Sequence, residues 1–186
     1  MADLTCRGIR YAATARNIPA IAIAGSNAAV PYYEVNSTEH DAYRVAALSF
    51  NIVDAIIKTT DRSHPILPLG YGVSVNMPPL SDNFMSVPVV QSRMTGEAEV
   101  DAAVPGKTPG TFMWSNLSPR AAGVNQCLNG DCDLPGETYV VAAGKVSLSL
   151  YTVDYTAPAT RKTASVMQRF AKLTGWKGGR GRYWRA

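Results

Sequence analysis

The chain holds few side chains that could do chemistry together. Its two histidines, His40 and His64, stand at a predicted helix start and beside a proline, and we interpret each as a surface residue rather than a metal ligand. Its three cysteines are too few for a four-cysteine zinc site or for a disulfide-stapled miniprotein. Neither a phosphate-binding loop nor a dinucleotide-binding fingerprint occurs in the sequence. The search for a reactive site therefore turns to weaker motifs.

Gly25, Ser26 and Asn27 form the first of these motifs. They follow the apolar run 18–24, which predicts a buried strand of a parallel sheet because both of its faces are apolar. Ligand crevices in α/β proteins lie at the carboxyl ends of such strands. The three residues are therefore either one edge of a substrate loop or a tight turn with no binding role.

Cys127 and Cys132 lie in a loop rich in glycine and asparagine. Their spacing permits a small disulfide in an oxidising compartment, and two free thiols are the alternative. Asn36 and Asn116 begin sequons for N-glycosylation. These features favour a secreted protein, whereas the residues after Met1 carry no charged start and apolar block of a signal peptide, so the localisation stays open.

The positive charge of the chain is concentrated at its end. The formal net charge is +4, and residues 155–186 contain eight basic residues and no acidic one, which leaves −4 for residues 1–154. In 177–185 the arginines alternate with Tyr183 and Trp184, a combination that can grip phosphates and stack on bases. The alternative is a solvated terminus. Glu97, Glu99 and Asp101 are interpreted as a solvated edge rather than a metal site.

Hydrophobic periodicity predicts an α/β protein. The composition, 46% hydrophobic and 17% charged, is that of a globular chain, and no run approaches the roughly 18 apolar residues of a membrane helix. Thr38 and Asp41 resemble a capping box. A helix after the last strand would place Val166, Phe170 and Leu173 on one face. The expected helices are 7–16, ended by a left-handed Asn17, and 38–58; the expected strands are 18–24, 71–77, 84–94, 111–115 and two runs within 138–153, the second alternating as on a half-buried strand.

Three segments, in this order, resemble the SurE-like survival-protein family of phosphatases and nucleotidases. They are NIPAIAI at 17–23, VSVNMP at 73–78, in which Asn76 matches an asparagine of the family's strand motif, and GKVSLSLYTVDYTA at 144–157. The resemblance implies a Rossmann-like parallel sheet with helices, followed by a β-hairpin extension and a basic C-terminal helix and tail. The cysteine-bearing loop and the sequons are more similar to the fungal, often secreted, branch.

The resemblance also implies an activity, and a gap in the machinery for it. Family members hydrolyse phosphate monoesters such as nucleotides with a divalent metal, Mg²⁺ or Mn²⁺, held by paired aspartates with a serine and an asparagine. None of those ligands has a counterpart here, because the resemblance covers only the second half of the family domain. We therefore expect residues 1–160 to be the C-terminal part of such a domain, 161–186 to be a basic helix and tail, and the chain alone to be inactive, as a truncated product, a mis-started gene model or a decayed paralogue.

Two roles of other classes are the alternatives. The first is a small binding module that uses the basic tail on nucleic acid. The second is an interaction protein, since in the family the hairpin and the C-terminal segment mediate subunit exchange, which implies a homo-oligomer.

Overall fold

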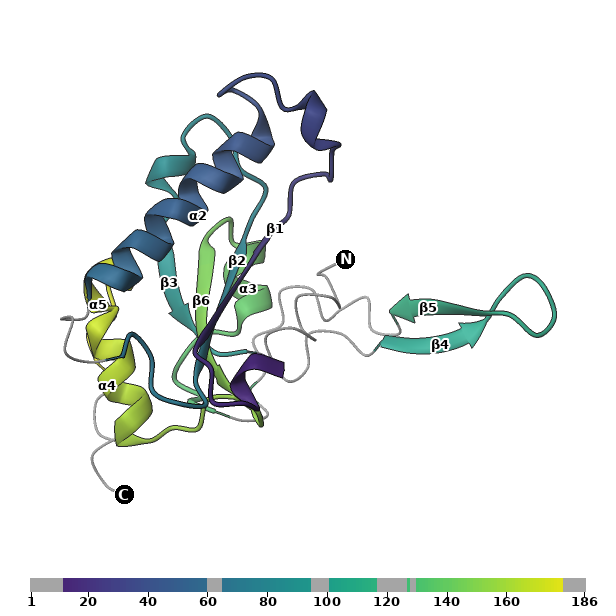
Figure 1. The fold of residues 1–186 in the computed structure, drawn as a ribbon. Helices are drawn as coiled ribbons and strands as arrows, with labels where there is room; N and C mark the ends of the chain where they lie inside the picture. Colours follow the sequence, from purple (N-terminus) through teal and green to yellow (C-terminus); the bar gives the residue numbers. More distant parts are fainter. Residues whose placement is uncertain (1–11, 60–64, 95–100, 117–126, 128–129, 179–186) are drawn as a thin grey trace.

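The computed structural model describes residues 12–59, 65–94, 101–116, 127 and 130–178 (Figure 1). The strands are β1 (Ala20–Gly25), β2 (Gly72–Met77), β3 (Val89–Ser92), β4 (Asp101–Pro105), β5 (Phe112–Asn116), β6 (Val146–Thr152) and β7 (Tyr155–Thr156). The α-helices are α2 (Asp41–Lys58), α3 (Glu137–Ala142), α4 (Arg161–Arg169) and α5 (Ala171–Thr174). Two short 3-10 helices, η1 (Tyr32–Glu34) and η2 (Phe84–Ser86), lie in the connections. In the part of the chain so described, no helix combines the length and apolar character that spanning a membrane requires.

One sheet forms the centre of the molecule, in the strand order β1-β2-β6-β3, with β7 added to β6. Strand β1 pairs with β2 in parallel, from Ala20 opposite Gly72 to Gly25 opposite Met77. Strand β6 runs antiparallel to β2, and β3 runs parallel to β6. The predicted α/β fold with a parallel-containing sheet is confirmed, and the reversal at β6 makes the sheet mixed. The carboxyl ends of β1 and β2 therefore lie at one end of the sheet and that of β3 at the other.

Helices α2, α4 and α5 pack on one face of this sheet (Figure 1). Val73, Val75 and Met77 alternate along β2 and are wholly buried. They pack against the apolar side chains of α2 and against alternate residues of β6. The burial of each such side chain stabilises the folded state by roughly 1.5–3 kcal/mol. The shared core also contains Leu48, Ile52, Ile56, Leu148, Leu150, Val166, Met167 and Phe170. The division at residue 160 stays a prediction, but α4 packs into the same core as the sheet.

The prediction of a strand before Gly144 is wrong, because residues 137–142 form α3. Its sequence, ETYVVA, has strand-forming residues, yet Val140 is only 2% exposed and packs against the sheet. This tertiary contact outweighs the local preference of valine and tyrosine. Gly144, with φ of 72°, ends the helix and turns the chain into β6.

The predicted bounds of the other elements shift by a few residues. In 84–94 only Val89–Ser92 is a strand, because η2 occupies the first part. The helix predicted at 7–16 is described only from residue 12 onward, and Asn17 has the predicted left-handed conformation, with φ of 58°. In the C-terminal helices Val166 and Phe170 are buried, and Leu173 packs against the core as predicted.

A two-stranded hairpin extends away from the body (Figure 1). Strands β4 and β5 pair antiparallel, from Asp101 opposite Asn116 to Pro105 opposite Phe112. This is the hairpin extension that the family resemblance implies. Phe112 is 71% exposed and Met113 is 52% exposed, so the hairpin presents apolar side chains to solvent.

Candidate functional site

The carboxyl ends of β1 and β2 are held together by the candidate loop Gly25–Asn27. The Ser26 hydroxyl donates a hydrogen bond to the Met77 carbonyl at 2.7 Å. The Asn27 carboxamide accepts from the Leu80 backbone N–H at 3.1 Å and donates to the Leu80 carbonyl at 3.4 Å. The polar groups of Ser26 and Asn27 thus fasten the segment after β1 to the segment after β2. Of the two alternatives, this geometry favours a structural turn at the sheet's edge.

The start of α2 lies at the same end of the sheet. The predicted capping box of Thr38 and Asp41 is wrong, because the residue that caps the helix is His40, whose Nδ1 accepts from the Ala42 N–H at 3.1 Å. A side-chain acceptor at this position satisfies one of the amide groups that a helix start leaves unpaired. His40 was placed at the helix start, but its capping role was not predicted, since histidine is not among the common capping residues. His64 lies outside the described residues.

Arg44 joins this helix start to the segment after β2. Its guanidinium contacts Asp41 at 2.9 Å, Glu39 at 3.6 Å and the Asp82 carboxylate. The Arg44 side chain is 12% exposed, whereas the three acids are far more exposed. An isolated surface ion pair contributes little, but one partly buried arginine shared by several acids holds the two segments in register. This cluster was not predicted.

Asn76, the match to the family's strand motif, points from β2 to the face opposite the helical core. Its Nδ2 donates to Glu137 Oε2 at 3.2 Å, which ties β2 to the first turn of α3. Next to it, Ser92 and Ser149 share a hydrogen bond at 2.8 Å between β3 and β6. Asn76, Ser92 and Ser149 thus bond within the protein rather than project into an open site, whereas the buried Ser147 Oγ on this face has no hydrogen-bond partner among the described residues.

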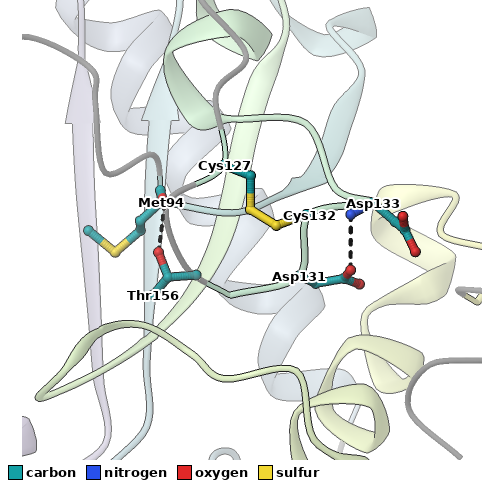
Figure 2. The surroundings of a disulfide bond; sticks show 6 residues. All are labelled: Met94, Cys127, Asp131, Cys132, Asp133 and Thr156. Carbon is teal, nitrogen blue, oxygen red and sulfur yellow. Dashed lines mark hydrogen bonds between the residues drawn. A yellow bond between two sulfur atoms is a disulfide. The ribbon is translucent and has the colours of Figure 1, made fainter.

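The disulfide lies at the other end of the sheet (Figure 2). Cys127 and Cys132 are bonded, with Cα atoms 5.3 Å apart. Gly130 between them has φ of 77°, and a Cβ there would lie 2.2 Å from Thr156 Cγ2. The Thr156 hydroxyl in turn donates to the Met94 carbonyl at 2.6 Å. The bridged loop is thus packed against the ends of β3 and β7.

Within this loop Asp131 faces the buried Arg93. Asp131 is 4% exposed and Arg93 is 2% exposed. Burial lowers the pKa of the Arg93 guanidinium, and the Asp131 carboxylate opposes that effect. Asp131 also accepts from the Asp133 N–H at 3.0 Å (Figure 2). A hollow of about 510 Å³ lies beside the loop, between Gln91 of β3 and the segment 174–178. Neither charge was singled out from the sequence.

The other predicted site residues stay apart. Asn36 is exposed between η1 and α2, and Asn116 ends β5. Glu97 and Glu99 lie outside the described residues, as do Cys6, Tyr183 and Trp184. Among the residues that the structure describes, no group of three or more His, Cys, Asp or Glu side chains could hold a metal ion.

Comparison with known proteins shows what this chain is similar to. No family model matches it. It is 32% identical over 160 residues to an acid phosphatase of Yarrowia lipolytica, a match that covers 81% of this chain and 44% of that protein. The SurE protein of Aquifex aeolicus shares 15% identity, with a TM-score of 0.41 over 88% of this chain and 54% of that structure.

The match to the acid phosphatase extends over most of this chain, but the chain spans less than half the length of that relative. The resemblance to a phosphatase family predicted from the three sequence segments is confirmed by this relative, and the chain is similar to part of that acid phosphatase.

Proposed function

We propose that this chain is part of a metal-dependent hydrolase of phosphate monoesters, in which it supplies the sheet and the loops at the carboxyl ends of β1 and β2. The observation that carries the proposal is the match of 160 residues to an acid phosphatase. The chain's own contribution would be to position these loops, through the bonds of Ser26 to Met77 and of Asn27 to Leu80. The substrate class would be nucleotides or other phosphate monoesters.

The residues at this edge do not fit the divalent metal of the family by themselves. Mg²⁺ and Mn²⁺ need several hard oxygen ligands, carboxylates above all. The edge offers the hydroxyl of Ser26 and the carboxamides of Asn27 and Asn76, and each of these already bonds to the protein. The carboxylates nearby, Glu39, Asp41 and Asp82, are paired with Arg44, and none of the described residues forms a group of three that could hold a metal ion. We infer that metal-dependent turnover requires carboxylates from a polypeptide segment other than the described residues, and that this chain alone does not turn over phosphate esters.

A phosphatase assay of the purified chain tests this proposal. The substrates are p-nitrophenyl phosphate and nucleoside monophosphates, each with Mg²⁺, with Mn²⁺ and with a chelator. The Yarrowia lipolytica acid phosphatase serves as the positive control in the same buffers. We expect no turnover by the chain alone and metal-dependent turnover when it is co-expressed with the part of the relative that it does not match. Metal-dependent turnover by the chain alone that survives extensive purification would contradict the inference.

A second role, as an interaction protein, is favoured by the hairpin. Strands β4 and β5 extend from the body and expose Phe112 and Met113. Apolar side chains on a projecting hairpin suit contact with another subunit. In this role the chain would form a homo-oligomer through the hairpin, and light scattering of the purified chain would measure it.

The disulfide supports a proposal about the compartment. Bonded cysteines persist in oxidising environments and are rare where thiols are kept reduced. We infer that the chain matures in a secretory compartment. Alkylation and mass measurement of the protein from its natural source would find Cys127 and Cys132 protected, and two alkylated thiols would refute this inference.

A further inference from the structure

A basic groove lies where the C-terminal end of α2 meets α4 and α5. Its volume is about 610 Å³. Lys58 and Thr59 line it from α2, and Gln168, Arg169 and Lys172 line it from the C-terminal helices. None of the described residues that line it is acidic. Three cationic side chains thus surround one hollow at the opposite side of the core from the candidate sheet edge.

Arg169 has a buried hydrogen-bond donor without an acceptor among the described residues. Its Nη1 donates to the Pro65 carbonyl at 3.5 Å, and its Nε is buried without an acceptor among the described residues. A guanidinium carries five N–H groups, and a buried donor without an acceptor destabilises the folded protein. Burial also lowers the pKa of Arg169. An anion seated beside this guanidinium would supply the acceptors that it lacks.

The two lysines add charge that the protein only partly balances. Lys58 Nζ lies 2.6 Å from Asp54 Oδ2, one turn earlier on α2. Lys172 is exposed, and no acidic side chain of the described residues lies within ion-pair distance of Lys172 or Arg169. Like charges held around one hollow repel each other, and a bound anion removes this repulsion.

We propose that this groove binds the phosphate groups of a single-stranded nucleic acid. A guanidinium bonds phosphate oxygens in a fork geometry, and flanking lysines add point charges. A chain of phosphates is favoured over a single phosphate because the whole C-terminal segment is basic: no acidic residue occurs from position 155 to 186, and Arg161, Lys162 and Lys177 add charge to the same segment. The proposal is independent of the phosphatase proposal, since the groove shares no residue with the sheet edge.

Fluorescence anisotropy with a labelled oligothymidylate tests the groove in the full chain. The oligonucleotide has about 12 nucleotides, within the span that one such site covers. Titrations run from about 50 to about 200 mM salt, because the dependence on salt reports the phosphates neutralised. The double variant Arg169→Gln/Lys172→Gln is compared with the control Lys107→Gln/Lys145→Gln, which removes the same charge at two exposed lysines far from the groove.

We expect the groove variant to bind about tenfold more weakly and its log–log salt slope to be shallower by about 1.4, two contacts at roughly 0.7 each. The control should keep its Kd within about twofold. Because Arg169 is partly buried, thermal melts check that the variants fold, and the single variant of the exposed Lys172 should still weaken binding by about threefold.

Three results would overturn the proposal. The first is a parent chain that does not bind the oligonucleotide. The second is an equal loss in the groove variant and the control, or no loss in either, which would assign binding to general charge or to the tail. The third is displacement of the oligonucleotide by inorganic phosphate or AMP at matching concentrations, which would indicate a site for a single phosphate.

Discussion

The disulfide should contribute measurably to the stability of the chain. Cys127 and Cys132 close a loop of six residues, with a sequence separation of 5. The chain-entropy relation for a loop of this size gives a stabilisation of about 2 kcal/mol, because the cross-link restricts the unfolded chain. The bridge also holds Asp131 opposite Arg93, and both side chains are almost completely buried. Loss of the bridge would loosen this pair, so we expect the measured loss to equal or exceed the entropic value.

The test compares the parent with the Cys127→Ser/Cys132→Ser variant by urea unfolding, followed by tryptophan fluorescence. The free energy of unfolding should fall by about 2 kcal/mol, which corresponds to about 4–8 °C in Tm for a chain of this size. Dithiothreitol should lower the stability of the parent by the same amount and leave the variant unchanged. The control is Cys6→Ser, which leaves the bridge intact and should keep the parent's sensitivity to dithiothreitol. A double variant within about 0.5 kcal/mol of the parent would refute the reasoning.

Three further changes test the sheet edge, the core and the hairpin. Asn27→Ala removes both hydrogen bonds to Leu80 and should cost about 1–2 kcal/mol in urea unfolding; an unchanged midpoint would argue against the latch between the ends of β1 and β2. Ile56→Ala, at a wholly buried position of α2, should cost about 2–5 kcal/mol, and a smaller loss would show that α2 is not packed as described. Phe112→Ser/Met113→Ser should shift any oligomer seen by light scattering toward monomer without lowering Tm, whereas an unchanged mass would remove the hairpin from the interface.

The elements that were predicted best are those whose apolar pattern alone determines their environment. The run 18–24 is apolar on both faces and forms β1, parallel to β2, as predicted. It lies at the edge of the described sheet and is only half-buried, which periodicity cannot reveal because the order of strands depends on distant segments. The long helix was likewise placed correctly in its interior, whereas its first residue depended on the side-chain bond of His40.

The place of the candidate loop in the fold could be predicted from the sequence, whereas its hydrogen-bond partners could not. Gly25–Asn27 does lie at the carboxyl end of a parallel strand, as the order of elements indicates. The partners of Ser26 and Asn27 lie more than 50 positions away in the sequence, at Met77 and Leu80. Local pattern carries no information about such partners. The burial of Arg93 and Asp131 was not predicted for the same reason, because the local sequence around a charged residue does not show whether that residue is buried.

Strand β6 shows how a polar pattern can mislead. Its serines alternate with Val146, Leu148 and Leu150, which predicts a strand with one face in water, yet residues 146–151 are all buried. The register explains this, because Ser149 lies opposite Ser74 of β2 and Ser92 of β3, so that three strands place small hydroxyl side chains on one face. Small side chains let α3 lie close to that face, and the bond between Ser92 and Ser149 satisfies hydroxyls that the helix shields from water. The alternation is therefore that of a central strand with an apolar layer on one side and a short helix on the other.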